Sequence, residues 1–119
     1  GGSNAKGHFA EVFRLEWDGT KLGTTSLPRL PIPLANACGA LLGETLYVAG
    51  GQENPEVVRT SNRVFRIQLD DPQARWEPVE PFPGAGRLFA LAASWDGAFW
   101  IVGGADLYRG KMERQNGDT

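Results

Sequence analysis

The segment 52–62 concentrates the side chains that could bind an anion and transfer a proton. Glu53, Glu56 and Arg59 lie within seven residues of one another in it. Arginine offers a planar fork of N–H donors that can hold a carboxylate through two hydrogen bonds, and a nearby glutamate can act as general acid or base. The competing interpretation is a solvated loop whose charges only keep the protein soluble.

Other kinds of reactive site find little support in the sequence. His8 is the only histidine and has no evident serine or aspartate partner, so a catalytic triad is not indicated. Cys38 is the only cysteine, which excludes an intrachain disulfide, and we expect it to be a buried, inert thiol. With no cluster of cysteine and histidine, the sequence predicts no metal site.

The composition is that of an ordinary globular domain. The chain has 119 residues, 41% of them hydrophobic, and a formal net charge of −2, which offers no basic field for nucleic acid. No apolar run approaches the roughly 20 residues needed to span a bilayer. The 16 glycines and 8 prolines fall between short apolar runs, a pattern typical of an all-β chain with many turns.

The sequence repeats itself with a period of 52 or 53 residues. The similar runs 12–15 and 64–67 are 52 residues apart, and the double glycines 50–51 and 103–104 are 53 residues apart. An acidic turn and then a proline-rich segment follow each of the two similar runs. Several independent features that recur at one period indicate that the chain is built from copies of one structural unit.

Each unit is predicted to hold four short strands. In the complete unit we expect them at 35–41, 45–49, 63–69 and 75–79, and the next unit begins with strands at 89–95 and 98–102. The Asp96–Gly97 pair between the last two is a strong hairpin signal, because glycine accepts a positive φ. We expect the four tryptophans to pack in the core, Trp95 being the only one that could offer a platform for a ligand ring.

A period near 50 residues with four strands per unit is typical of a β-propeller blade. The double glycine after Tyr47, and Trp76 29 residues beyond that tyrosine, resemble the kelch repeat. Arg87, ahead of the next inner strand, fits the same pattern. The sequence departs from it at Thr24 and Leu34, which stand one unit earlier than Trp76 and Arg87. The resemblance implies an all-β fold, a kelch-type β-propeller.

The chain is long enough for about two blades of such a propeller. We expect residues 1–33 to form the end of one blade, residues 34–86 a complete blade and residues 87–119 the start of the next. Blades bury apolar surface mainly against their neighbours. We therefore expect either a fragment of a larger, six-bladed propeller or a chain that closes a ring by self-association.

Antiparallel strand order places the candidate residues on one rim of the propeller. The loops after the second and the fourth strand of each blade emerge on the same side, so 52–62 shares that side with Asn36 and Arg87. Long loops on a rigid scaffold are where binding residues concentrate. We expect Asn36, Arg59 and Arg87 to bind substrate, although Arg87 could instead simply tie adjacent blades together.

Three segments, 12–17, 46–51 and 61–67, give a finer resemblance to the cyclically permuted sialic acid mutarotases, the N-acetylneuraminate epimerase-like kelch proteins. This resemblance implies an isomerase that interconverts the anomers of N-acetylneuraminate by acid–base ring opening, without a metal or an organic cofactor. We expect Glu53 or Glu56 to transfer the proton, and Arg59 or Arg87 to hold the substrate carboxylate.

The same resemblance implies a bacterial protein of carbohydrate metabolism, of a family often exported to the periplasm or secreted. The alternative is a non-enzymatic kelch module that binds a protein or a glycan through the same rim. Neither interpretation involves nucleic acid or a membrane. By itself the two-blade chain is expected to show no turnover, because every blade lines the funnel of a propeller.

Overall fold

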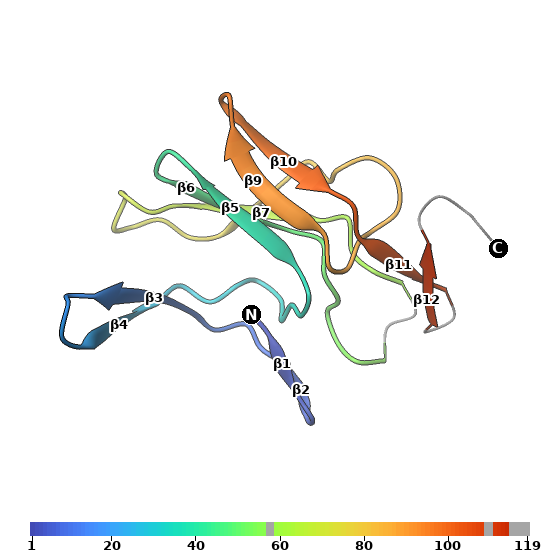
Figure 1. The fold of residues 1–119 in the computed structure, drawn as a ribbon, viewed down its shortest axis with the longest axis horizontal. Helices are drawn as coiled ribbons and strands as arrows, with labels where there is room; N and C mark the ends of the chain where they lie inside the picture. The colour runs from blue at the N-terminus through green and yellow to red at the C-terminus, as the bar shows by residue number, and fades with distance from the viewer. Residues whose placement is uncertain (57–58, 109–110, 115–119) are drawn as a thin grey trace.

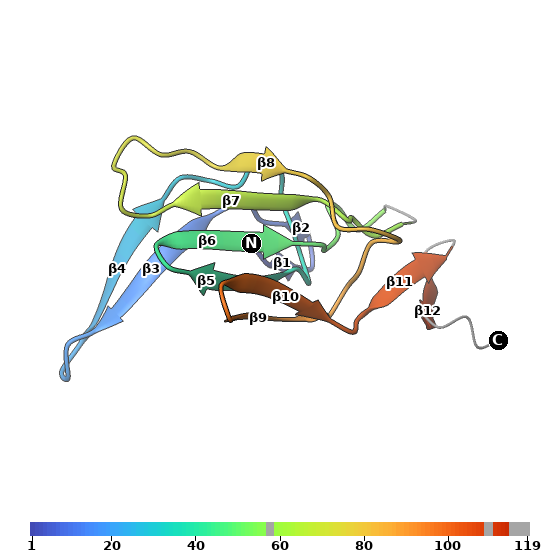
Figure 2. The ribbon, with the colours of Figure 1, turned by 90° about the horizontal axis from the view of Figure 1, so that it is seen from above.

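The computed structural model describes residues 1–56, 59–108 and 111–114, and this part of the chain is all-β, without a helix (Figure 1). No described helix is therefore long and apolar enough to cross a membrane. At the centre is an antiparallel sheet of four strands that pair in chain order, as Figure 2 shows from above. They are β5 (Cys38–Leu42), β6 (Thr45–Ala49), β7 (Val64–Gln68) and β8 (Glu77–Val79).

Two longer hairpins lie on opposite sides of this sheet. β3 (Val12–Trp17) and β4 (Leu22–Leu27) lie below it in Figure 1, and β9 (Leu91–Trp95) and β10 (Ala98–Val102) lie above it. Two short hairpins complete the description. They are β1 (Ser3–Asn4) with β2 (Gly7–His8), and β11 (Ala105–Tyr108) with β12 (Lys111–Arg114).

The repeat in the sequence is also a repeat in three dimensions. The β9–β10 hairpin is the counterpart of β5–β6, and β3–β4 is the counterpart of β7–β8. The hydrogen bonds between units recur as well. The N–H of Gly2 donates to the carbonyl of Leu34 over 2.7 Å, and the N–H of Gly51 donates to the carbonyl of Arg87 over 2.8 Å. The chain is thus arranged as about two propeller blades, with one complete four-stranded sheet.

The double glycine makes the close contact between neighbouring blades possible. Gly50 and Gly51 have φ values of 72° and 92°, which side chains rarely adopt. A Cβ atom on Gly50 would lie 2.7 Å from the carbonyl oxygen of Arg87, and one on Gly51 would lie 2.9 Å from that of Ala35. Both distances are shorter than van der Waals contact, so only glycine fits at this junction.

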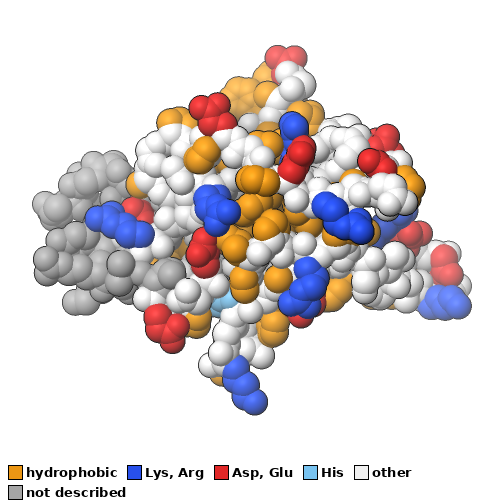
Figure 3. Space-filling view, turned by 180° about the vertical axis from the view of Figure 1, so that it is seen from behind, with side chains coloured by type: hydrophobic (Ala, Val, Ile, Leu, Met, Phe, Trp, Pro, Cys, Tyr) orange, Lys and Arg blue, Asp and Glu red, His pale blue; other side chains and the backbone are white. Residues whose placement is uncertain are grey.

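The hydrophobic core lies between the first two blades. Ala10, Leu30 and Leu34 contribute to it from the first blade and its connection to β5. The remaining buried members, Phe65, Ile67 and Trp76, come from β7 and the segment before β8. On the face seen in Figure 3, hydrophobic side chains gather near the middle, with charged side chains around them. Contact between the first two blades therefore forms the hydrophobic core of the described residues.

Trp76 ties the two blades together with a hydrogen bond as well as by packing. It is 8% exposed, and its Nε1–H donates to the carbonyl of Pro28 over 2.8 Å. We expect Trp76→Phe to lower the free energy of unfolding by about 1–3 kcal/mol, because it leaves that carbonyl without its donor. Urea unfolding followed by circular dichroism measures the change.

Trp17 supplies the matched control for this prediction. Trp17 lies on β3 and is 66% exposed, so Trp17→Phe should change the free energy of unfolding by less than about 0.5 kcal/mol. Equal losses in Trp76→Phe and Trp17→Phe would contradict the role assigned to the Trp76 hydrogen bond.

Several predicted strand boundaries were wrong. The first strand of the complete blade begins at Cys38 rather than at residue 35, because Asn36 has a φ of 60° that interrupts the pairing. Phe89, with a φ of 59°, shortens the equivalent strand in the next blade in the same way. β8 begins at Glu77 rather than at residue 75, because a turn in which the N–H of Ala74 bonds to Asp71 precedes it. β7 is one residue shorter at each end than predicted.

The prediction that all four tryptophans pack in the core was also wrong. Trp17, Trp95 and Trp100 are 66%, 68% and 46% exposed, whereas Trp76 is buried. The three exposed tryptophans belong to the β3–β4 and β9–β10 hairpins, and β3 and β10 each have an edge with no partner strand in the described part of the chain. We predict that further blades, or another copy of the chain, cover these hairpins.

Candidate functional site

A polar pocket of about 290 Å³ lies at the end of the central sheet where β6 leads into β7. It is lined by Glu53 and by residues 59–63. β6 and β7 are antiparallel neighbours, so the loop that joins them must return to the sheet beside its starting point. The fold of this loop brings Glu53 and Arg59 into one pocket, which we call the rim pocket.

Arg63 holds the carboxylate of Glu53 within the rim pocket. Its Nη1 donates to Oε1 of Glu53 over 3.3 Å, and the two side chains are 46% and 40% exposed. The guanidinium of Arg63 also lies over the ring of Phe65, 4.9 Å from the centroid. Exposed ion pairs contribute little to stability. The consequence of this contact is therefore the orientation of the Glu53 carboxylate rather than stability.

Asp106 brings the third blade into contact with the same loop. It is buried at the start of β11, and its Oδ1 accepts hydrogen bonds from the hydroxyl of Thr60 over 2.6 Å and from the N–H of Leu107 over 2.7 Å. Its Oδ2 accepts a hydrogen bond from Nη1 of Arg59 over 3.3 Å. The rim pocket is thus built by the second blade and braced by the third.

The hydrogen bonds of Asp106 control its protonation. Burial raises the pKa of this carboxyl group, but the hydrogen bonds from the Thr60 hydroxyl and from the N–H groups of Leu107 and Thr60, with the charge of Arg59, outweigh burial. The pKa of Asp106 is therefore lower than its ordinary value. The ionised form is the form that this environment favours.

The lowered pKa of Asp106 predicts a pH dependence of stability. A carboxyl group whose pKa is lower in the folded state stabilises the fold above its unfolded pKa of about 3.9, and this contribution is lost as the pH falls through the folded value. We expect the difference in unfolding free energy between the wild type and Asp106→Asn to be constant above about pH 5 and to shrink on acidification. Urea unfolding at several pH values measures it, and a difference that does not change with pH would contradict the prediction.

Glu56 and Arg87 do not line the rim pocket. Glu56 is exposed, and its backbone N–H donates to the side chain of Asn54 over 2.9 Å. Nη1 of Arg87 donates to the carbonyl of Gly103 over 3.0 Å, and its guanidinium lies 5.7 Å from the centroid of the Phe82 ring. Arg87 thus connects the start of the third blade to the end of β10.

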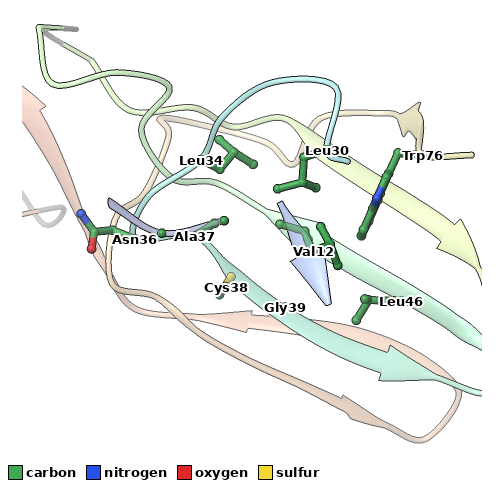
Figure 4. A pocket seen from close by; sticks show the side chains of 12 residues that line it. Val12, Leu30, Leu34, Asn36, Ala37, Cys38, Gly39, Leu46 and Trp76 are labelled. Atoms are coloured by element: carbon green, nitrogen blue, oxygen red, sulfur yellow. The ribbon is translucent and has the colours of Figure 1, made fainter. Parts of the chain in front are cut away.

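Asn36 lines a different, apolar cavity of about 350 Å³ between the first two blades (Figure 4). Val12, Leu46 and Trp76 also line it, with Cys38. Cys38 was expected to be buried, but it is half-buried, and its Sγ lies 3.6 Å from the carbonyl oxygen of Ala49. This partial burial raises the pKa of the thiol. A raised pKa disfavours the nucleophilic thiolate.

The rim pocket is the better candidate for chemistry. One carboxylate and two guanidinium groups line it, so it can bind an anion and exchange a proton with it. No charged side chain lines the apolar cavity among the residues that the structure describes. Within the described residues, no group of three or more His, Cys, Asp and Glu side chains could hold a metal ion.

Sequence reasoning gave Arg63 and Asp106 no role in the site, although it placed the loop that holds Asp106 on the same rim. Arg63 was predicted to begin a strand, and nothing in the sequence indicated that its side chain contacts Glu53. Asp106 lies 53 residues after Glu53, so the period of the repeat places both at the same point of successive blades. That offset is the signal in the sequence that could have given Asp106 a role in the site.

Comparison with known proteins shows similarity to N-acetylneuraminate epimerases over part of the chain. The chain is 34% identical over 77 residues to the protein of that name from Haemophilus influenzae strain PittEE, and 31% identical over 77 residues to the one from Pasteurella multocida. Each match covers 65% of this chain but 19% and 18% of those proteins. The chain thus spans about a fifth of the length of the curated relatives it matches.

Other comparisons bear on the fold. Kelch-like protein 33 from Homo sapiens is 32% identical over 80 residues, which are 66% of this chain and 14% of that protein. The solved structure of YjhT matches with a TM-score of 0.64 at 19% identity, covering 78% of this chain and 27% of that one. No protein-family model matches the chain. The prediction of an all-β chain that forms about two blades of a kelch-type β-propeller is confirmed, as is the resemblance to N-acetylneuraminate epimerases.

Proposed function

We propose that this chain belongs to a propeller that interconverts the anomers of N-acetylneuraminate, and that the rim pocket supplies the reacting groups. The observation that carries the proposal is the convergence of Glu53, Arg59 and Arg63 in one polar pocket. A sugar acid needs a cation for its carboxylate and a group that moves a proton, and this pocket offers both. The similarity to proteins named N-acetylneuraminate epimerase supports the same substrate.

The proposed reaction is acid–base opening and closure of the pyranose ring. A proton leaves the anomeric hydroxyl, another is delivered to the ring oxygen, and the bond between that oxygen and the anomeric carbon breaks. Rotation of the open-chain ketone followed by closure on its other face gives the second anomer. The reaction has no net change in bonds or electrons, so it requires a proton-transfer group and a means of holding the substrate.

Three residues of the rim pocket are proposed to share these roles. Arg63 orients the Glu53 carboxylate over 3.3 Å, which makes Glu53 the proposed proton-transfer group. Arg59, whose side chain is 63% exposed, is the proposed ligand of the substrate carboxylate. Because that carboxylate is attached to the anomeric carbon, binding it fixes the reacting centre near Glu53.

The direct test is the rate of anomer exchange measured by NMR on N-acetylneuraminate, with the complete propeller that carries this sequence. We expect exchange well above the rate in buffer at the same pH. When the sugar acid is added to the two-blade chain, the NMR signals of the rim-pocket residues should shift, but the rate of anomer exchange should not increase. A rate with the complete propeller that equals that of buffer would contradict the proposal.

The second candidate is a module that binds a protein or a glycan without turnover, because one fold can carry either an enzyme or a binding module and the chain is also similar to kelch-like protein 33. It predicts that the rim binds its ligand while the anomer exchange rate stays at the value of buffer. The same experiment therefore separates the two candidates.

A further inference from the structure

We infer that Asp106, contributed by the third blade, is a positioning residue for Arg59 in the rim pocket of the second. The significance of Arg59 in this inference rests on the proposed function, whereas the contact between the two residues stands on the geometry alone. The rim pocket is then a site shared by two blades, and the third blade determines how well it binds an anion.

The two oxygens of the Asp106 carboxylate have separate partners. Oδ1 accepts from the Thr60 hydroxyl, from the Leu107 N–H and, over 3.3 Å, from the Thr60 N–H, while Oδ2 accepts from Nη1 of Arg59. The bonds to Oδ1 fix the carboxylate in place on the backbone of both blades. Oδ2 is therefore held at a defined point next to the Arg59 side chain.

Arg59 is the kind of side chain that gains from such a fixed partner. The side chain of Arg59 is 63% exposed, whereas that of Asp106 is 11% exposed, so an exposed guanidinium meets a buried carboxylate. A long exposed side chain loses rotamer freedom when it binds a ligand, and a residue that restricts it beforehand reduces that loss. The guanidinium has five N–H donors, so a hydrogen bond through Nη1 is compatible with binding a ligand carboxylate.

The residue at the Asp106 position of the repeat contacts different partners in the second and third blades. The counterpart of Asp106 in the second blade is Glu53, 53 residues earlier, whose carboxylate faces Arg63 of its own blade. Asp106 instead reaches back to the preceding blade and contacts Arg59 and Thr60. The same position of the repeat thus serves the pocket of its own blade at Glu53 and that of the neighbouring blade at Asp106.

Asp106→Asn isolates the contact with Arg59. The amide oxygen of asparagine can still accept from Thr60 and Leu107, which leaves the amide nitrogen, a donor, facing the Arg59 guanidinium. We expect the dissociation constant of the chain for N-acetylneuraminate, measured by NMR titration, to rise by up to about tenfold, because Arg59 must then be ordered when the ligand binds. The Nε–Hε signal of Arg59 should shift and narrow in the free protein as the side chain gains freedom.

Two further variants separate positioning from general stability. Trp76→Phe, which destabilises the chain away from the pocket, should leave the dissociation constant and the Arg59 signal unchanged. In an Arg59→Gln background, Asp106→Asn should weaken binding no further, because its effect passes through Arg59. Weakening by the same factor in that background would overturn the inference, as would an Asp106→Asn chain that binds like the wild type.

The failure of this inference is distinguishable from the failure of the proposed function. A wild-type chain that does not bind the sugar acid contradicts the proposed function, and the Arg59 signal of the free protein still decides the positioning role. An Arg59 signal that Asp106→Asn leaves unchanged overturns the inference, whether or not the sugar binds.

Discussion

Glu53→Gln should lower the rate of anomer exchange by the complete propeller by about 10²–10⁴-fold, the usual contribution of a general acid or base. Glutamine keeps the size and the polarity of the side chain but cannot take up and return the proton. The unfolding free energy should change by less than about 1 kcal/mol, because the ion pair of Glu53 with Arg63 is exposed. NMR exchange and urea unfolding on the same samples measure the two effects.

Glu56→Gln is the matched control for this prediction. It makes the same chemical change three residues along the same loop, but Glu56 is exposed and lies outside the rim pocket. Its exchange rate should equal that of the wild type. If Glu56→Gln abolished exchange and Glu53→Gln did not, the assignment of the proton-transfer group would be reversed, and a full rate in both variants would remove this loop from the chemistry.

The hairpins of this fold were predictable because their signals are local. β6 and β10 have the predicted bounds, since each follows a two-residue turn that contains glycine, Gly43 or Gly97, and ends before a double glycine. The strands before them were predicted too long. An asparagine at a φ of 60° is a familiar exception, but a phenylalanine at 59°, as at Phe89, gives no signal in its residue type.

The burial of each tryptophan could not be predicted from residue type, because it depends on what is packed against that side chain. Trp76 lies where the first blade covers the second, and it is buried. Trp17 and Trp95 are 66% and 68% exposed on hairpins that have an open side in the described part of the chain. A pattern in the sequence identifies a strand, but not whether a neighbouring blade covers it.

The candidate site was predictable in part for the same reason. Glu53 and Arg59 belong to one loop, so their proximity follows from the return of the chain between β6 and β7. Asp106 comes from another blade, and a contact across 46 or 47 residues depends on how blades pack. The importance of Gly86 could not be predicted from the repeat either. Its counterpart 53 residues earlier is Pro33, so the repeat does not indicate that glycine is required at this position.

Gly86→Ala should cause the largest loss of stability among single substitutions near the rim pocket. A Cβ atom at this position would overlap the carbonyl group of Thr60 and would lie 2.6 Å from the carbonyl carbon of Ser61. Backbone atoms cannot swing aside as side-chain ends can, so the segment 59–63 must move. Overpacking of this kind costs about 1–3 kcal/mol and occasionally more. We expect an unfolding free energy lower by that amount and a weaker affinity for the sugar acid.

Gly23→Ala separates this clash from the general effect of adding a methyl group. Gly23 is exposed in β4, and a Cβ atom there would meet the carbonyl oxygen of Glu16 at 3.8 Å, an ordinary contact. That variant should be as stable as the wild type or slightly more stable, because glycine weakens a strand. Equal stability of Gly86→Ala and Gly23→Ala would show that residues 59–63 do not rest on Gly86. In that case the loss of affinity in Gly86→Ala would have to be absent as well.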